Sequence, residues 1–253
     1  MKLFHRVIGE GPPLLILHGL FGSSDNWQTH ARSLAGAYSV YLVDQRNHGH
    51  SPHDAEMDYT LMANDLFELI ADLGLRDVRL IGHSMGGKTI VRFAQLYGFL
   101  IDKMVVADMG VKAYPPHHDE VFKGLFAVDV ASCPSRKEAE NRLSPFIQDA
   151  GTLQFLLKNL SWKESGVLAW RFNLEAIYAQ REKIMAALPA DKVEADTLFL
   201  TGGRSQYVPQ SDYNSIREVA PAARFKSIPD AGHWLHADRP QEFIHICEEF
   251  FSN

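Results

Sequence analysis

The chain has 253 residues, of which 46% are hydrophobic and 22% charged, with a formal net charge of -6 at pH 7. This length allows a substantial core, and the acidic balance argues against a nucleic-acid partner held through its phosphates. Two distant cysteines, Cys133 and Cys247, indicate neither a disulfide framework nor a zinc site.

The N-terminal residues lack the apolar stretch of a signal peptide, and no run approaches the roughly 18 apolar residues of a membrane span. We therefore expect a cytoplasmic protein without a membrane span. Along the chain, apolar segments typical of buried strands occupy residues 3–7, 14–18, 40–44, 78–81, 104–108, 198–201 and 225–228. Between them, residues 62–73 and 90–97 show helical spacing and end at Gly74 and Gly98. This alternation predicts an α/β fold with a mostly parallel central sheet flanked by helices.

The alternation stops at residues 111–189, where strand patterns vanish and prolines and glycines separate several short helices. We interpret 111–189 as a helical lid inserted within a single domain, whose core is formed by residues 1–110 and 190–253. We expect most aromatic residues of the lid to form its own small core and a minority to face a ligand. These residues are Phe122, Phe126, Phe146, Phe155, Trp162, Trp170, Phe172 and Tyr178.

Residues 78–89, VRLIGHSMGGKT, fit two different motifs. Gly82, Ser84 and Gly86 match the G-x-S-x-G nucleophile elbow, in which a strained strand-to-helix turn exposes the serine hydroxyl. The same letters match G-x-x-x-x-G-K-T, the phosphate-binding loop of NTPases, and residues 103–108 could then supply a magnesium-binding strand. The first motif requires a histidine and oxyanion donors elsewhere in the chain, whereas the second requires magnesium ligands.

A serine hydroxyl is a weak nucleophile at neutral pH and needs a nearby base. Among twelve histidines, His233 follows the last predicted strand and precedes a helix that starts after Pro240. Its loop should lie at the carboxyl edge of the sheet, where Ser84 also projects and where open α/β sheets bind ligands. We predict His233 as the base. No H-E-x-x-H spacing occurs, and we predict no metal and no cofactor.

Acyl transfer also requires donors for the oxygen that becomes negative in the tetrahedral intermediate. HGLFGS, residues 18–23, follows the apolar strand segment at 14–17. Its turn should bring the Leu20 N–H beside that of Met85, the residue after the serine. We therefore predict Leu20 and Met85 as the oxyanion donors.

Four motifs together resemble the α/β-hydrolase fold family, and more closely the small bacterial esterases of the YbfF type. They are HGLFGS at 18–23, DQRNHGHS at 44–51, GHSMGGK at 82–88 and AGHWLH at 231–236, so that the resemblance spans nearly the whole chain. An NTPase has no use for the other three motifs in this order, which disfavours the phosphate-binding loop. The resemblance implies that Ser84 attacks an ester or thioester carbonyl while His233 accepts and then returns the proton. It also places Leu20 and Met85 at the oxyanion positions.

The acid of the triad is less directly indicated. The family's common acid site follows the strand at 198–201, where this chain reads GGRSQYVP, with Ser205 in place of the usual aspartate. A carboxylate fixes the tautomer of the histidine and stabilises its charge, which a serine cannot do. We assign Asp108, at the end of the strand predicted at 104–108, as the acid and Ser205 as a helper that hydrogen-bonds His233 or Asp108. Asp196, Asp212 and Asp230 are weaker candidates.

The segment at 44–51 resembles the family pattern D-x-R-G-x-G-x-S with Asn47 replacing the first glycine, and we expect Arg46 and Ser51 to shape a turn beside the site. Lys88 is expected to be a solvated helix residue. The resemblance thus implies a carboxylesterase for short- to medium-chain acyl esters, with some activity on acyl-CoA thioesters. Two alternatives remain: a carbon-carbon hydrolase or cofactor-free lyase of the same fold, and a ligand-sensing protein with little turnover. Either way the partner is a small molecule, and the sequence leaves the oligomeric state open.

Overall fold

The computed structural model describes residues 1–115, 118–163 and 165–252 and has a seven-stranded sheet at its centre. The strand order is β1-β3-β2-β4-β5-β8-β9, and every pair is parallel except β1 with β3. The strands are β1 (His5–Ile8), β2 (Pro13–Leu17), β3 (Ser39–Val43), β4 (Val78–His83), β5 (Ile101–Ala107), β8 (Asp196–Gly202) and β9 (Arg224–Ile228). The expected α/β architecture and its seven strand segments are confirmed.

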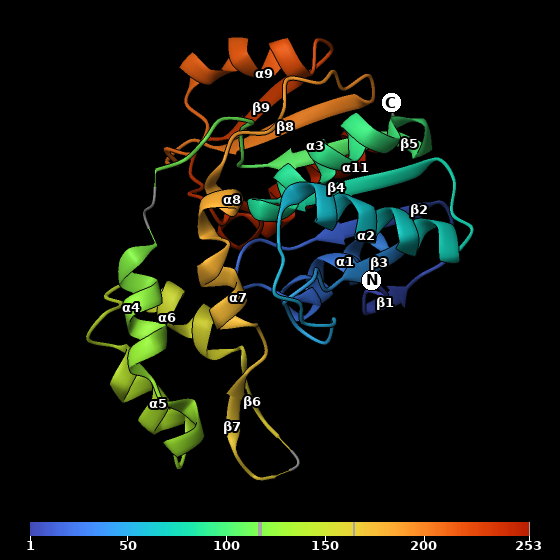
Figure 1. The fold of residues 1–253 in the computed structure, drawn as a ribbon. Helices are drawn as coiled ribbons and strands as arrows, with labels where there is room; N and C mark the ends of the chain where they lie inside the picture. The colour runs from blue at the N-terminus through green and yellow to red at the C-terminus, as the bar shows by residue number, and fades with distance from the viewer. Residues whose placement is uncertain (116–117, 164, 253) are drawn as a thin grey trace.

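Helices cover both faces of the sheet (Figure 1). Successive residues of a strand point to opposite faces, and in β2 the pair Leu14 and Ile16 joins one buried cluster while Leu15 and Leu17 join another. The first cluster includes residues of α1 and α11, and the second includes residues of α2, α3 and α9. Burial on both faces explains why the inner strands β2 and β8 are nearly continuous apolar runs, whereas the edge strands β1 and β9 are only partly buried. These helices are α1 (Gln28–Leu34), α2 (Tyr59–Asp72), α3 (Met85–Tyr97), α9 (Tyr213–Val219) and α11 (Pro240–Ser252).

In the part of 111–189 that the structure describes, the predicted lid contributes no strand to this sheet, and it lies largely to one side of it (Figure 1). Its described residues, which leave out 116, 117 and 164, form α4 (Asp119–Ala127), α5 (Arg136–Leu143), α6 (Ala150–Leu157), α7 (Leu174–Ala179) and α8 (Arg181–Met185). They also form an antiparallel pair that the sequence pattern did not predict, β6 (Leu160–Trp162) with β7 (Leu168–Trp170). Strands of three residues are too short to show an alternation of apolar and polar side chains.

The aromatic residues of this segment divide between buried and exposed positions. Phe122 and Phe172 are buried in a third cluster, which also contains Phe21 and Met85 from the sheet-bearing part of the chain. Trp162 is 52% exposed. The third cluster therefore joins the predicted lid to the loops at the carboxyl edge of the sheet. The remaining short elements are α10 (Leu235–Asp238) and 3-10 turns at Ser24–Trp27, Gly98–Leu100, Val130–Ser132 and Gln210–Asp212.

Candidate active site

Ser84 occupies the sharp turn between β4 and α3. Its backbone angles are φ 53° and ψ -119°, a left-handed conformation that costs a residue with a side chain about 1–3 kcal/mol. The turn also needs a close approach of two segments, because a Cβ on Gly86 would collide with the carbonyl oxygens of Leu17 and His18. The conformation predicted for a nucleophile elbow is therefore present at Ser84.

His233, in the loop after β9, reaches Ser84 from a distant part of the chain. Its Nε2 lies 3.0 Å from Ser84 Oγ. Two contacts hold the imidazole and its backbone: the ring stacks on Tyr207 with centroids 3.7 Å apart, and His83 Nε2 donates to the His233 carbonyl at 2.9 Å. Burial lowers the pKa of His83 to about 3, so this neighbour is neutral and does not oppose a positive charge on His233.

Asp108 directly follows β5 and is fully buried, also with a left-handed φ of 48°. Its Oδ2 accepts a hydrogen bond from His233 Nδ1 at 2.8 Å and a second from the Ser205 hydroxyl. Its Oδ1 accepts from the Gly202 N–H at 3.0 Å. Three donors thus surround the carboxylate, and Ser205 contacts Asp108, one of the two partners expected for it.

The other aspartates considered from the sequence form ion pairs elsewhere. Asp230 lies 3.3 Å from Arg239, Asp212 lies 2.5 Å from Lys112, and Asp196 pairs with Arg224. Asp108 is therefore the carboxylate that the fold brings to His233.

Leu20 and Met85 line one small cavity together with Ser84. The loop that carries Leu20 follows β2 and packs closely on the serine, because a Cβ on Gly19 would lie 3.1 Å from the Ser84 Cβ. The cavity at the serine measures about 20 Å³, which is room for about one water molecule. A larger cavity of about 350 Å³ shares the lining residues Tyr114, His118 and Met185 with it.

Lys88 is buried, and the expectation of a solvated helix residue is wrong. Only 1% of the residue is exposed, and its Nζ donates to the carbonyl oxygens of Lys112 at 2.7 Å and Ala186 at 2.5 Å. The nitrogen also faces the rings of Tyr59 and Tyr114, at 5.5 and 5.0 Å from their centroids. Burial lowers the pKa of Lys88 to about 7. Both carbonyls come from the predicted lid, so that the local sequence of α3 contains no sign of this environment.

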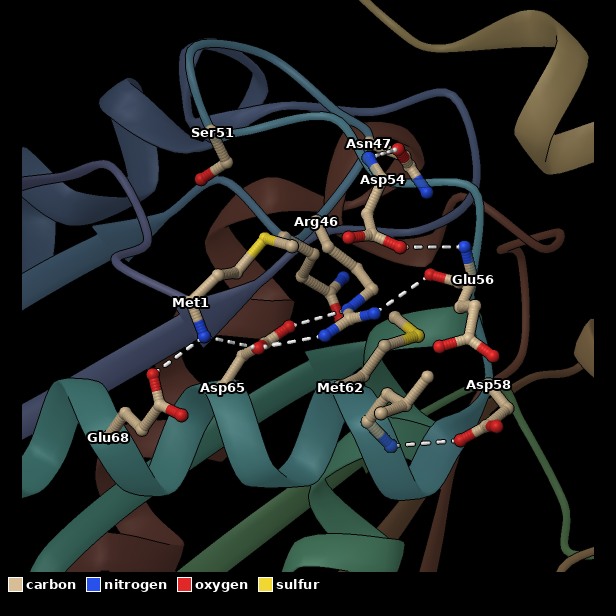
Figure 2. A network of polar contacts seen from close by, with 12 residues as sticks. Met1, Arg46, Asn47, Ser51, Asp54, Glu56, Asp58, Met62, Asp65 and Glu68 are labelled. Carbon is tan, nitrogen blue, oxygen red and sulfur yellow. Dashed lines mark hydrogen bonds and ion pairs between the residues drawn. The ribbon is translucent and has the colours of Figure 1, made fainter.

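The segment at 44–51 forms a hydrogen-bonded turn in which Arg46 and Ser51 both take part, as expected from the sequence. Figure 2 shows the Arg46 guanidinium bonded to the Asp65 carboxylate at 2.6 and 2.9 Å and to the Glu56 carbonyl at 2.8 Å. Ser51 donates to the Asp44 carbonyl at 2.5 Å. Asn47 has φ 64°, a conformation that asparagine tolerates better than most residues, which explains how it replaces a glycine.

Sequence reasoning did not single out two further residues near the site, Tyr207 and His48. Tyr207 stacks on the catalytic-site candidate His233, and His48 accepts a hydrogen bond from the Phe21 N–H at 3.1 Å. Both lie in motifs of the sequence named above, His48 at 44–51 and Tyr207 at 202–209, but nothing in those motifs predicts these contacts. Among the described residues, no group of three His, Cys, Asp or Glu could hold a metal ion, and no helix is long and apolar enough to cross a membrane.

Comparisons with known proteins identify the family of the chain. The chain is 39% identical over 252 residues to a putative esterase/lipase of Haemophilus influenzae, covering 98% of this chain and 87% of that protein. It is 34% identical to the esterase YbfF of Escherichia coli, covering 95% and 93%. The solved structure of an esterase from a marine microorganism superposes with a TM-score of 0.96 at 41% identity, covering 98% and 99%. The model of the alpha/beta hydrolase family matches residues 14–246, and the chain belongs to this family.

Proposed function

We propose that the protein is a serine carboxylesterase that hydrolyses short- to medium-chain acyl esters through an acyl-enzyme on Ser84. The observation that carries the proposal is the continuous line of hydrogen bonds from Ser84 Oγ through the His233 ring to Asp108. Relatives named as esterases, at 34–39% identity over nearly the whole chain, support the same reaction class.

In the first half of the reaction, His233 Nε2 accepts the proton of Ser84 as the serine oxygen bonds to the ester carbonyl carbon. The carbonyl oxygen becomes negative, and the N–H groups of Leu20 and Met85 stabilise it. The intermediate then expels the alcohol, which takes the proton from His233. In the second half, water attacks the acyl-enzyme by the same route and releases the carboxylic acid.

Asp108 supports His233 in both halves of the reaction. By accepting from Nδ1, it leaves Nε2 as the acceptor that Ser84 requires, and its charge stabilises the imidazolium. Ser205 donates to the same Oδ2 and accepts from the Tyr207 N–H at 3.2 Å. We infer that Ser205 holds the carboxylate in place rather than taking part in proton transfer.

The space at the serine favours a small acyl group. The cavity at Ser84 is about 20 Å³, and the adjoining cavity of about 350 Å³ gives room for the rest of a substrate. An acyl-CoA thioester would form the same acyl-enzyme, because its carbonyl is attacked in the same way and a thiol replaces the alcohol as leaving group. Thioesters are therefore the second substrate class that we propose.

The test combines active-site labelling with a substrate series. A fluorophosphonate probe should label the parent protein but not Ser84→Ala, and p-nitrophenyl esters of increasing acyl length should show a burst of p-nitrophenol equal to the labelled fraction. Acyl-CoA substrates, followed by free thiol, test the thioester class. Equal labelling of Ser84→Ala would overturn the proposal. So would turnover of a diketone without ester hydrolysis, or retention of a ligand without release of product.

A further inference from the structure

The backbone at Leu20 and Phe21 needs support from outside its own turn. The Gly22 N–H donates to the Gly19 carbonyl at 2.9 Å and closes a four-residue turn in which Phe21 has a left-handed φ of 59°. Glycine or asparagine usually occupies such a position. Rotation of the peptide unit between Leu20 and Phe21 would relieve the strain, but it would also turn the Leu20 carbonyl oxygen to where the Phe21 N–H now points.

His48 opposes this rotation from the sheet side. Its Nε2 accepts from the Phe21 N–H at 3.1 Å, and its Nδ1 donates to the Arg46 carbonyl at 2.9 Å. The second bond fixes the tautomer, so that Nε2 presents a lone pair, which attracts the N–H and would repel a carbonyl oxygen. The ring is fully buried, and burial lowers the pKa of His48 to about 3. The ring is therefore neutral throughout the physiological pH range.

The loop that carries the Arg46 carbonyl is held by an ion pair of the same residue. The Arg46 Nε and Nη2 donate to the buried Asp65 carboxylate, and Nη1 donates to the Glu56 carbonyl (Figure 2). The ion pair thus anchors the loop whose carbonyl orients His48, and through His48 it acts on the Phe21 peptide.

The predicted lid holds the other side of Phe21. Asn159, 3% exposed and located between α6 and β6, donates from Nδ2 to the Phe21 carbonyl at 2.8 Å. The Phe21 ring packs on two lid residues, with centroid distances of 5.5 Å to Phe122 and 5.0 Å to Phe172. The N–H of Phe21 is therefore bound by the sheet-bearing part of the chain, whereas its carbonyl and ring are bound by the lid.

We propose that His48 and Asn159 are positioning residues that hold Phe21 from both sides and thereby fix the turn at 19–22, which carries the Leu20 N–H of the proposed oxyanion site. This inference rests on the proposed function, in which Leu20 is an oxyanion donor. The contacts that pack the lid on Phe21 are then the same contacts that support the turn of the oxyanion site.

The experiment uses the full chain with two substitutions on opposite sides of Phe21, His48→Leu and Asn159→Leu. His48→Gln, which retains an acceptor, is the conservative variant, and His30→Gln is the matched control. His30 is also a buried histidine, but its Nε2 donates to the His236 carbonyl, away from Phe21. Labelling with the fluorophosphonate gives the active fraction of each variant. The measurements are kcat and KM for a p-nitrophenyl ester and the inhibition constant of a trifluoromethyl ketone, which mimics the tetrahedral intermediate.

Both leucine variants should lower kcat per labelled site by about 10- to 100-fold with KM changed less than about threefold, because misplacing one donor weakens binding of the transition state alone. The inhibition constant of the ketone should rise by the same factor. His48→Gln should recover most of the loss, and His30→Gln should match the parent.

A fall in kcat without weaker binding of the ketone would overturn the inference, as would unchanged kcat in either leucine variant. If one variant fails to fold, the other approaches the same peptide from the opposite side and decides the question. Absence of ester turnover and labelling in the parent would overturn the proposed function together with this inference. Parent turnover with unaffected variants would overturn the inference alone.

Discussion

Three buried histidines should make the protein lose stability as the pH falls from 7 to 5. Burial lowers the pKa of His18 to about 4 and the pKa values of His48 and His83 to about 3, from the ordinary value of 6.5. Their nitrogens serve the fold in the neutral form: His18 Nε2 accepts from the Gln45 N–H at 3.1 Å, as His48 Nε2 does from Phe21. The stabilisation they give is complete above pH 6.5 and is lost as the pH falls towards the folded-state pKa values.

The size of the effect follows from proton linkage. At pH 5 the unfolded chain carries a proton on nearly every histidine, whereas these three remain neutral in the folded state, so that unfolding takes up about three protons. The contribution of each histidine to the free energy of unfolding then falls by about 2 kcal/mol between pH 7 and pH 5, and the contribution of the three together falls by up to about 6 kcal/mol. That sum is comparable to the total stability of many domains, about 5–15 kcal/mol.

Urea unfolding at half-unit steps from pH 7 to pH 5 measures the free energy of unfolding, and calorimetry in buffers of different ionisation enthalpy counts the protons. The slope near pH 5 should be at least about 4 kcal/mol per pH unit, because burial also lowers the pKa values of His30 and His236, which add to the proton uptake. His48→Gln should reduce the uptake by about one proton, because glutamine does not titrate. A flat profile between pH 7 and pH 5, or equal proton uptake by His48→Gln and the parent, would refute the assignment of neutral buried imidazoles.

Three further predictions concern single side chains. Asp108→Asn should lower kcat by about 10³- to 10⁴-fold because an amide favours the wrong tautomer of the histidine. Ser205→Ala should lower kcat by about tenfold, which corresponds to the loss of one hydrogen bond to a charged group. Steady-state ester kinetics measure both variants, and equal losses of kcat would contradict the separate roles. Between pH 7 and 9 the free energy of unfolding of the parent should rise by up to about 1.4 kcal/mol per pH unit, because the depressed pKa leaves Lys88 protonated only in the unfolded chain. Lys88→Met should lack this rise. Parallel urea-derived profiles of variant and parent would disprove the prediction. Asp65→Asn should lower the free energy of unfolding by about 3–5 kcal/mol by leaving the Arg46 charge buried without its partner, and a urea-derived loss below about 1 kcal/mol would speak against it.

The sheet could be predicted from the sequence because its inner strands, such as β2 and β8, are short apolar runs that are almost wholly buried. Ser84 and His233 could be selected because each stands in a local motif next to a strand, and Asp108 because it directly ends one. In the structure, His233 lies within hydrogen-bonding distance of both Ser84 and Asp108. The local motifs and the order of the strands along the chain were therefore sufficient to select these three residues.

The features that escaped prediction depend on contacts between distant segments. Lys88 is covered by carbonyl groups 24 and 98 residues away, which no window of sequence around α3 reveals. The stacking of Tyr207 on His233 and the bond from Phe21 to His48 arise in the same way. Such contacts exist only after the loops at the carboxyl edge have assembled.

The contacts of Lys88 also show where the predicted lid at 111–189 could be replaced by another polypeptide segment. One nitrogen reaches the carbonyl groups of both Lys112 and Ala186, and the Leu188 N–H donates to the Val111 carbonyl at 2.9 Å, so the intervening polypeptide leaves and rejoins the sheet at a single narrow neck. A foreign insert whose two ends lie equally close could be grafted at this neck without stretching the scaffold beneath it. An exchange of this insert thus has a route that spares the sheet, provided that the new insert keeps the contacts of Asn159 and Phe172 with Phe21.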